Sequence, residues 1–297
     1  MKYVKKILYY LFKDHKSLKI SFLIHFGRLI PDDLYLKLMF KLEMGYPLNL
    51  KNPQTFSEKL QWLKLYNRKS EYTTMVDKYA VKDYVASLIG KEYIIPTFGV
   101  WKTPNDIDWD SLPEKFVLKT NHSGGNTGVI ICKDKSTFDK QKAIDILWRS
   151  YKSDIYESLR EWPYKNVPKR IIAEKFMNEK GSDDLVDYKF TCFNGCVGNV
   201  MVCIERGTSN PKFYFYDREW NLLPLNVRGK NTDKNFKLPK PLCMDKMFEL
   251  AGKLSEGIPF LRVDFYSIED HPYFGELTFF PASGFDKNLL KETEEYF

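Results

Sequence analysis

The pattern of apolar and polar positions divides the 297-residue chain into a helical first part and a mixed second part. Residues 1–50 are aromatic-rich and repeat apolar residues at helical spacing. The next segment opens with Thr55 three residues before Glu58, the capping-box arrangement of a helix start. Another helix is expected from about Thr74 to Ile89, with Gly90 as its stop. We therefore predict a helical N-terminal region over residues 1–73.

From residue 116 onward, short apolar runs separated by turn residues predict strands. Asn194-Gly195 lies between two such runs, and this dipeptide favours a tight hairpin turn. The antiparallel pairs predict an α+β body over residues 74–297, with a glycine-loop lobe at about 113–172 and a C-terminal lobe at about 173–297. The expected elements are strands or hairpins within 93–101, 116–133, 169–177, 188–205, 212–225 and 260–280, and helices over about 136–151 and 242–256.

The composition of the chain excludes some classes of protein. No apolar run reaches the roughly 18 residues of a membrane-spanning helix, and no small-residue cleavage site follows the basic, apolar residues 1–12. The five cysteines are odd in number and lie mostly in apolar runs, which indicates free thiols in a reducing compartment. The net charge of +7 favours anionic partners, and clusters of aromatic residues with arginines typical of nucleic-acid binding are lacking.

The first residues allow two interpretations. Apolar residues at helical spacing lie beside lysines, so this segment either packs on the domain or makes a peripheral contact with a membrane. The residues concerned are Leu8, Leu11 and Phe12, with Lys2, Lys5, Lys6 and Lys13.

The first candidate site is the glycine loop in "FVLKTNHSGGNTGVIICK". Its residues leave the backbone free to turn N–H groups towards a phosphate and add hydroxyl groups. They are Ser123, Gly124, Gly125, Thr127 and Gly128. Lys119, on the strand before the loop, is placed to neutralise phosphate charge. The spacing is neither G-x-G-x-x-G nor the Walker pattern, so a glycine-rich hairpin with a lysine reaching to solvent is the alternative.

The second candidate site is an acidic pair near the C-terminus. Asp264 lies inside an apolar run and Glu276 precedes another, and a hairpin would place the two carboxylates on neighbouring strands. Buried carboxylates need partners, and a divalent cation neutralises two together. The alternative is an ion pair between Asp264 and Arg262.

The third candidate is a set of charges at strand ends. Glu174 ends one apolar strand, Asp187 and Lys189 share a face of the next, and Arg206 ends a later one. We expect these four side chains to converge on one sheet surface as the floor of a site. A solvated sheet face is the alternative.

The order of these elements resembles the ATP-grasp fold. The stretches "FVLKTNHSGG" and "GELTFFPASG" are most similar to the TupA-like ATP-grasp branch of polysaccharide biosynthesis proteins. The resemblance covers roughly residues 75–286, and it rests on several motifs in the right order rather than on one.

The resemblance implies an ATP site between two α+β lobes. Lys119 would hold the phosphates, and the loop 122–128 would close over them. Glu174 would meet the adenine, and Asp187 would lie near the ribose or the substrate. Backbone groups would also meet the adenine, from Lys175, Phe176 and Met177.

The resemblance also implies Mg²⁺, bound by Asp264 and Glu276. Other ATP-grasp ligases carry an asparagine ligand where this chain has Thr278, so Thr278 would ligate through its hydroxyl or only through water. This difference leaves the number of metal ions open.

The implied catalytic residues carry charge. Lys189 would lie near the γ-phosphate, where glutamate-adding ligases often have arginine. Arg206 would steady the acyl-phosphate and tetrahedral states. His122 is the histidine inside the implied site, with proton transfer or phosphate contact as one role and loop packing as the other.

The implied activity is ATP-dependent carboxylate–amine ligation through an acyl phosphate. By analogy, the acceptor is a uronic-acid-containing glycan or its lipid-linked precursor and the amine an amino acid, in the cytoplasm or at the inner face of the membrane. A kinase acting on a sugar hydroxyl and a non-catalytic glycan-binding protein are the rival interpretations. A glycosyltransferase is more distant, because it would need a nucleotide-sugar donor.

Overall fold

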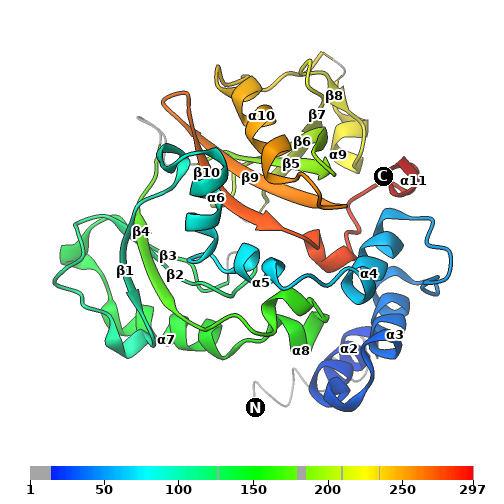
Figure 1. The fold of residues 1–297 in the computed structure, drawn as a ribbon, viewed down its shortest axis with the longest axis horizontal. Helices are drawn as coiled ribbons and strands as arrows, with labels where there is room; N and C mark the ends of the chain where they lie inside the picture. Colours follow the sequence, from blue (N-terminus) through cyan, green and yellow to red (C-terminus); the bar gives the residue numbers. More distant parts are fainter. Residues whose placement is uncertain (1–14, 126, 179–184, 209, 234, 297) are drawn as a thin grey trace.

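The structure, a computed structural model, describes residues 15–125, 127–178, 185–208, 210–233 and 235–296. Two antiparallel sheets form the body, and helices surround them (Figure 1). The α-helices are α2 (His15–Phe26), α3 (Asp32–Met44), α4 (Phe56–Tyr66), α5 (Glu71–Val76), α6 (Val81–Ile89), α7 (Lys140–Lys152), α8 (Ile155–Leu159), α9 (Val227–Asn231), α10 (Met244–Leu254) and α11 (Lys291–Tyr296).

The smaller sheet has four strands in the order β1-β4-β2-β3. Its strands are β1 (Thr97–Trp101), β2 (Phe116–Thr120), β3 (Ile130–Cys132) and β4 (Ile171–Lys175). The apolar side chains of β2 and β4 pack on α7 through a small core that includes Phe116, Leu118 and Leu147. Because β1 and the end of β4 belong to this sheet, it extends beyond the 113–172 lobe expected from the sequence.

The larger sheet has six strands in the order β10-β9-β5-β6-β7-β8. Its strands are β5 (Asp187–Phe193), β6 (Cys196–Ile204), β7 (Lys212–Tyr216), β8 (Leu222–Leu223), β9 (Leu261–Ile268) and β10 (His271–Thr278). One face of this sheet is apolar and packs against α6 and α10 in the main hydrophobic core, which includes Phe190, Val263 and Leu277. The opposite face is therefore left for polar residues.

Local sequence signals account for several of these elements. The Thr55 hydroxyl accepts a hydrogen bond from the N–H of Glu58 at 3.2 Å, and the Glu58 carboxylate accepts one from the N–H of Thr55 at 3.2 Å, which confirms the capping box. Asn194 and Gly195 have φ angles of 49° and 87°, as the tight turn between β5 and β6 requires.

The helix expected over 74–89 is instead two helices, α5 and α6. The Asp77 carboxylate accepts hydrogen bonds from the N–H groups of Tyr79 and Ala80 at 2.9 and 3.3 Å, so the chain turns there before α6 begins. This side chain competes with helical hydrogen bonding, as short acidic residues do. The C-terminal stop at Gly90 is confirmed.

The helix expected over 136–151 begins later, at Lys140. Asp139 is its N-cap and accepts a hydrogen bond from the N–H of Lys142 at 2.9 Å. The helix expected over 242–256 spans Met244–Leu254. The start of α7 therefore follows its capping side chain rather than the hydrophobic period.

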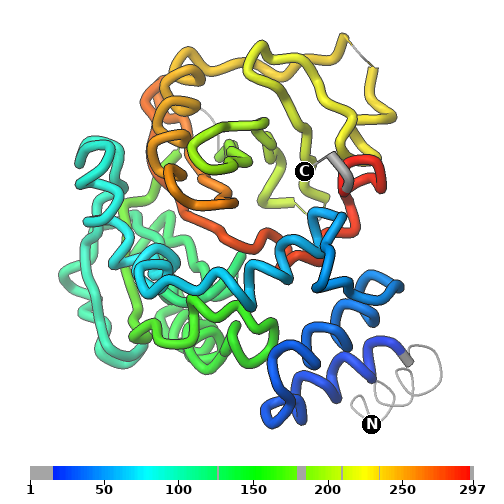
Figure 2. Tube along the Cα trace, turned by 45° about the vertical axis from the view of Figure 1, so that its right-hand side comes forward, coloured from blue at the N-terminus to red at the C-terminus, as the bar shows by residue number. Residues whose placement is uncertain are grey.

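The N-terminal helices α2 and α3 pack on one another and lie at one corner of the molecule (Figures 1 and 2). Arg160, after α8, joins them to the body: it donates to the carbonyl of Gly27 at 2.7 Å and pairs with Asp32 at 3.1 Å. The predicted stripe of Leu8, Leu11 and Phe12 lies outside the described residues. Within the part of the chain that is described, helices are too short or too polar to cross a bilayer.

Candidate active site

The polar face of the six-stranded sheet carries three rows of side chains across β5, β9 and β10. In the middle row Lys189 of β5 lies opposite Asp264 of β9, and Asp264 lies opposite Glu276 of β10. The next row contains Arg262 and Thr278. The hairpin therefore brings Asp264 and Glu276 side by side, as the sequence predicts, and Thr278 lies two residues further along β10.

Arg262 lies at the centre of these oxygen atoms. Its Nε is 2.7 Å from Asp264 Oδ1, and its Nη2 is 2.8 Å from both Asp264 Oδ2 and Glu276 Oε1. The same Nη2 is 3.0 Å from the Thr278 hydroxyl. The ion pair between Arg262 and Asp264 that the sequence offered as an alternative to a metal site is thus present, and it includes Glu276.

Glu276 is ionised because of the cations around it. Burial alone would raise the pKa of its carboxyl group, but Lys78, Arg262 and Lys189 outweigh this effect and lower the pKa to about 2. Its side chain is still 29% exposed. A charged, partly accessible carboxylate of this kind is suited to binding a cation.

A second ionic group lies at the other end of the polar face. Asp187 Oδ2 is 3.1 Å from Lys189 Nζ, and Asp187 Oδ1 is 2.7 Å from Arg206 Nη1. Lys189 also forms a short contact with Asp264. Burial lowers the pKa of Lys189, but Asp264, Asp187 and Glu276 together outweigh this effect and the net pKa is raised. Lys189 therefore carries its charge between two carboxylates.

Glu174 lies in the other sheet. The sequence analysis expected it on one surface with Asp187, Lys189 and Arg206, and this expectation is wrong, because β4 belongs to the four-stranded sheet. Its carboxylate lies between two lysines, 2.5 Å from Lys119 Nζ and 2.7 Å from Lys82 Nζ. Burial raises the pKa of Glu174, but Lys119 and Lys82 outweigh it and the pKa is lowered.

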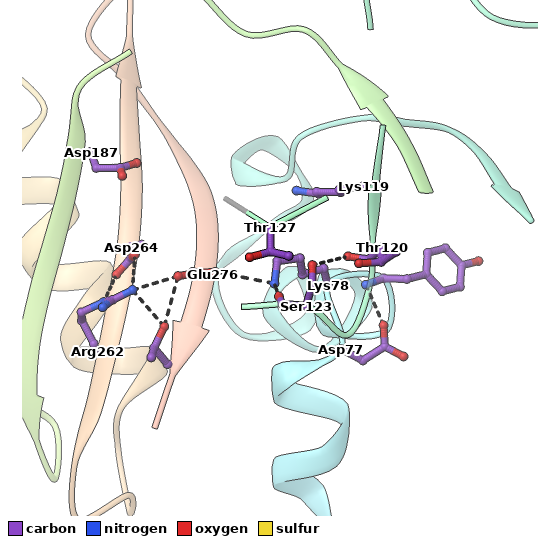
Figure 3. A network of polar contacts seen from close by, with 12 residues as sticks. Asp77, Lys78, Lys119, Thr120, Ser123, Thr127, Asp187, Arg262, Asp264 and Glu276 are labelled. Carbon is purple, nitrogen blue, oxygen red and sulfur yellow. Dashed lines mark hydrogen bonds and ion pairs between the residues drawn. The ribbon is translucent and has the colours of Figure 1, made fainter. Parts of the chain in front are cut away.

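Lys78 connects the two sheets. It lies in the turn between α5 and α6, and its Nζ is 3.8 Å from Glu276 Oε2 on β10. The same ammonium donates a short hydrogen bond to the carbonyl of Ser123 in the glycine loop (Figure 3). The glycine loop and the acidic pair therefore face one another across a single lysine.

The glycine loop is attached to the body at both ends. Thr120 and Ser150 hydroxyls lie 2.8 Å apart, and the Ser150 hydroxyl also donates to the carbonyl of Thr127 at 3.4 Å. Gly128 has a φ of 73°, and a Cβ atom there would lie 2.3 Å from the Ser150 side chain, so only glycine fits. Gly124 and Gly125 are exposed, as is Thr127, whereas Ser123 is buried.

A cleft of about 380 Å³ lies beside the end of β4. One wall contains the residues expected to meet the adenine, Lys175, Phe176 and Met177. The other wall is the turn of the β9–β10 hairpin and includes Ile268 and Tyr273, which the sequence analysis did not single out. A flat, partly apolar base fits a cleft with this lining.

His122 is buried at the start of the glycine loop. Its Nδ1 lies 3.3 Å from the Asn121 side-chain oxygen, and its ring meets Tyr151 edge-on. Burial, together with Lys169, lowers the pKa of His122 to about 4. The imidazole is therefore neutral near pH 7, which favours the packing role over proton transfer.

This placement predicts how stability depends on pH. A histidine whose pKa is lowered in the folded state contributes stability above its unfolded pKa of about 6.5 and loses it as the pH falls towards about 4. We expect wild-type protein to lose on the order of 1 kcal/mol at pH 5 from this group, after screening, and His122→Asn to lose less. Urea unfolding at pH 7 and pH 5 measures both.

The exposed His25 provides the control, because His25→Asn should keep the wild-type pH dependence. A turnover profile measures the catalytic alternative. If wild-type activity shows an inflection between about pH 5.5 and 7.5 that His122→Asn abolishes, the packing assignment is wrong.

The facing surfaces have an excess of positive charge. Among the described residues, the ion pairs of these surfaces include seven basic side chains and five carboxylates, so the site as a whole suits a polyanion. The basic residues are Lys78, Lys82, Lys119, Arg170, Lys189, Arg206 and Arg262, and the carboxylates are Asp77, Glu174, Asp187, Asp264 and Glu276.

The residues on β10 and β9 fit a magnesium ion in their donor chemistry. Asp264, Glu276 and Thr278 offer hard oxygen atoms on adjacent strands. Among the described residues, no cluster of three or more histidine, cysteine, aspartate or glutamate side chains is placed to bind a metal. Since Mg²⁺ commonly uses one or two carboxylates and completes its shell with substrate phosphates and water, the pair is sufficient when ATP supplies the rest.

Four basic residues of this site were not predicted from the sequence: Lys78, Lys82, Arg170 and Arg262. Lys78 and Lys82 were read as part of one continuous helix, although Asp77 before them is a helix-capping residue type. Arg262 was considered only as a partner of Asp264. Its position two residues before Asp264 on a strand places both side chains on the same face, and this signal was in the sequence.

The two sheets, the glycine loop and the acidic hairpin define a protein of the ATP-grasp class. A family model described as "TupA-like ATPgrasp" matches residues 58–297, so the chain belongs to the TupA-like ATP-grasp family. This places it among the ATP-grasp enzymes and confirms the resemblance read from the sequence. Among curated proteins, none matches this chain.

Solved structures with a similar fold are ATP-grasp ligases. D-alanine–D-alanine ligase from Helicobacter pylori aligns with 81% of this chain and 67% of its own, at 16% identity and a TM-score of 0.45. L-amino acid ligase from Bacillus licheniformis aligns with 87% of this chain and 57% of its own, at 12% identity and a TM-score of 0.47. The Bacillus anthracis D-alanine–D-alanine ligase complexed with ATP aligns with 74% of this chain and 58% of its own, at 15% identity and a TM-score of 0.42. This chain therefore spans about three fifths of the length of these ligases.

Proposed function

We propose that the protein is an ATP-dependent carboxylate–amine ligase that forms an amide through an acyl phosphate. The observation that carries the proposal is that an acidic pair on one sheet faces the glycine loop, with a lysine between them. Asp264 and Glu276 face the glycine loop, and Lys78 contacts both Glu276 and the carbonyl of Ser123. Carboxylates that hold a cation, opposite basic groups and a loop that hold phosphates, are the parts that phosphoryl transfer needs.

The ATP would lie between the two sheets. Its adenine would enter the cleft beside Lys175, Phe176 and Met177, and its phosphates would lie among Lys78, Lys119 and the loop of Ser123, Gly124, Gly125 and Thr127. Glu174 would contact the nucleoside or position Lys119, and Asp187 would lie towards the substrate. Lys78 is our addition to the residues expected from the sequence.

Asp264, Glu276 and Thr278 are the residues that would hold Mg²⁺. Bound there, the ion would neutralise phosphate charge. Arg262 keeps both carboxylates in place through its hydrogen bonds on the same face. Its charge also offsets their repulsion before any cation binds.

The reaction has two steps. A substrate carboxylate oxygen attacks the γ-phosphorus and ADP leaves, which gives an acyl phosphate. An amine nitrogen then attacks the acyl carbon, phosphate leaves, and the nitrogen loses a proton. In this scheme Lys189 and Arg206 stabilise the developing charge, and positioning with electrostatic stabilisation supplies most of the catalysis. No nucleophilic side chain is required.

The acceptor we propose is a uronic-acid-containing surface polysaccharide or its lipid-linked precursor, and the amine is an amino acid. The basic character of the site supports an acidic acceptor, and the role in polysaccharide biosynthesis is carried over from the resemblance read from the sequence. The place of action would be the cytoplasm, at or near the inner face of the membrane.

The proposal predicts that ATP turnover depends on both substrates. The protein is incubated with ATP, Mg²⁺, a panel of uronic-acid glycans and a panel of amino acids, and phosphate release and product mass are measured. We expect phosphate release to rise at least about tenfold for a matching pair over either substrate alone, with a product mass equal to an amide. Hydroxylamine in place of the amine should give a hydroxamate, because it captures an acyl phosphate.

The rival functions give different results in the same assay. A kinase would release ADP without free phosphate and leave a stable phosphorylated glycan that hydroxylamine does not change. A non-catalytic protein would turn over ATP at the background rate with every pair. Phosphate release that never responds to an amine or to hydroxylamine would refute the ligase mechanism.

A further inference from the structure

A row of apolar side chains on α2 and the turn that follows it points into water. Leu18, Phe22, Phe26 and Leu29 are 39%, 64%, 66% and 94% exposed. They are spaced by four, four and three residues, so they form one stripe along the helix. The rings of Phe22 and Phe26 lie 4.6 Å apart and form a continuous surface.

The opposite side of α2 is the side that packs into the protein. Leu23 is 7% exposed and forms a small core with Tyr35 and Met39 of α3. Arg160 donates to the carbonyl of Gly27 and its guanidinium stacks over the ring of Tyr35 at 3.9 Å. The helix is therefore fixed by its inner face, and the outer stripe has no part in holding the fold.

Exposed aromatic side chains that form a stripe usually mark a contact surface. The segment that carries this stripe has an excess of basic residues, of which Lys16, Arg28 and Lys37 form salt bridges with Glu43, Glu157 and Asp33. Residues 15–44 carry five basic residues, Lys16, Lys19, Arg28, Lys37 and Lys41, against three acidic ones. Together with the lysines of residues 2–13, the first 44 residues carry nine basic and four acidic residues, so they hold five of the seven net positive charges.

This charge selects among possible partners. A second copy of the chain would bring two positively charged faces together, which like-charge repulsion opposes. An anionic bilayer attracts the lysines and arginines to its headgroups, and it offers the phenylalanine and leucine side chains an apolar layer just below them. An anionic bilayer would therefore interact with both the basic and the apolar side chains of this surface.

We propose that the outer face of α2 and the 27–29 turn docks on the surface of an anionic membrane, with Phe22, Phe26 and Leu29 inserted between the headgroups. The docking is peripheral and reversible, because a few side chains and a basic surface give only moderate affinity. The inference goes beyond the ligase proposal and does not depend on it, since it concerns a surface made by other residues.

The test uses the full chain and vesicles. Wild-type protein is sedimented with vesicles of phosphatidylcholine alone or with about 30% phosphatidylglycerol. We expect binding to the anionic vesicles only, with release at high salt. Phe22→Ser with Phe26→Ser should lower the partition coefficient at least about tenfold, because two buried aromatic side chains are lost. Leu242→Ser removes an even more exposed apolar side chain, 86% exposed and in a different part of the chain, and should bind as wild type does.

A second measurement covers the case in which the double variant folds poorly. Cys196 is exposed, so Phe22→Cys is made with Cys196→Ser and labelled with an environment-sensitive dye. The dye emission should shift to the blue on addition of anionic vesicles. Wild-type protein that stays in the supernatant, an unshifted dye, or a dimer that Phe22→Ser with Phe26→Ser converts to a monomer would each overturn the proposal.

Discussion

Glu276→Gln is expected to lower Mg²⁺-dependent ATP turnover by about 10²- to 10³-fold while the protein stays folded. The substitution keeps the shape of the side chain and removes a charge that three nearby cations hold in its ionised form, with a pKa of about 2. An amide oxygen binds Mg²⁺ more weakly than a carboxylate does, so the midpoint of a Mg²⁺ titration should rise along with the loss of turnover.

Glu276 is a better test of the metal site than Asp264. The Asp264 side chain is 2% exposed and pairs with Arg262 and Lys189, so removing its charge would take one of two carboxylate partners from each of these buried cations and destabilise the fold. Glu276 is 29% exposed, so water can replace part of what is lost. Thermal unfolding of Glu276→Gln should therefore stay close to wild type.

Glu249→Gln is the matched control, because Glu249 lies on α10, is 45% exposed and pairs only with surface lysines. It should keep full activity. Full activity and an unchanged Mg²⁺ midpoint in Glu276→Gln would remove Glu276 from the proposed metal site and leave it as a partner of Arg262 alone.

Local signals in the sequence were enough to place the acidic hairpin. Strand alternation puts Arg262 and Asp264 on one face, and the short turn at Glu269 and Asp270 joins the two strands. A bulge between Phe274 and Glu276, which the sequence did not predict, then shifts the register by one residue so that Glu276 lies beside Asp264. Both turn residues are exposed. The same reasoning from a capping box and from Asn194-Gly195 predicted the nearby elements.

These local signals do not predict which strands become neighbours in a sheet. Glu174 ends an apolar strand like the others, and nothing within that strand says that its sheet partner carries Lys119. Its position depends on pairing between segments about 55 residues apart, which a local pattern does not encode. For the same reason, the local sequence around Lys78 does not predict that this lysine lies between the glycine loop and Glu276.

The buried cluster around Lys64 shows more clearly what local sequence signals do not predict. Lys64 of α4 is fully buried and donates to the carbonyls of Leu159 and Ser283 at 3.0 and 2.8 Å. Burial, opposed by Glu161, lowers its pKa to about 8. Ala282 and Ser283 adopt φ angles of 46° and 54°, so this lysine holds a strained turn directly after the proposed metal-binding strand. In sequence, Lys64 looks like an ordinary exposed position of an amphipathic helix.

Lys119→Gln is expected to weaken ATP binding by about 10- to 100-fold, because a hydrogen bond to a charged group contributes roughly 1.5–3 kcal/mol. In the structure without nucleotide its ammonium is neutralised by Glu174, 2.5 Å away. Phosphate oxygens would compete for the same ammonium. Isothermal titration with ATP and Mg²⁺ measures the affinity, and turnover at saturating ATP measures what remains of catalysis.

The fold should tolerate this change because Glu174 keeps a second partner, Lys82, at 2.7 Å. Lys115→Gln is the control, since Lys115 is exposed and lies just before the same strand. Lys82→Gln separates the two roles further: Lys82 also donates to the carbonyl of Ile95 and the hydroxyl of Thr97 at 2.8 and 2.7 Å. We therefore expect Lys82→Gln to lower thermal stability more and ATP affinity less than Lys119→Gln does.

The two lysines thus distinguish a phosphate ligand from a structural ion pair. If both variants lose stability equally and neither loses ATP affinity, Lys119 serves only to neutralise Glu174, and the phosphates must be held by Lys78 and the glycine loop. If Lys119→Gln loses affinity at unchanged stability, the lysine before the loop binds ATP. We expect the second result, because Lys119 is more accessible to a ligand than its counter-ion Glu174. The Lys119 side chain is 16% exposed and that of Glu174 is 6% exposed.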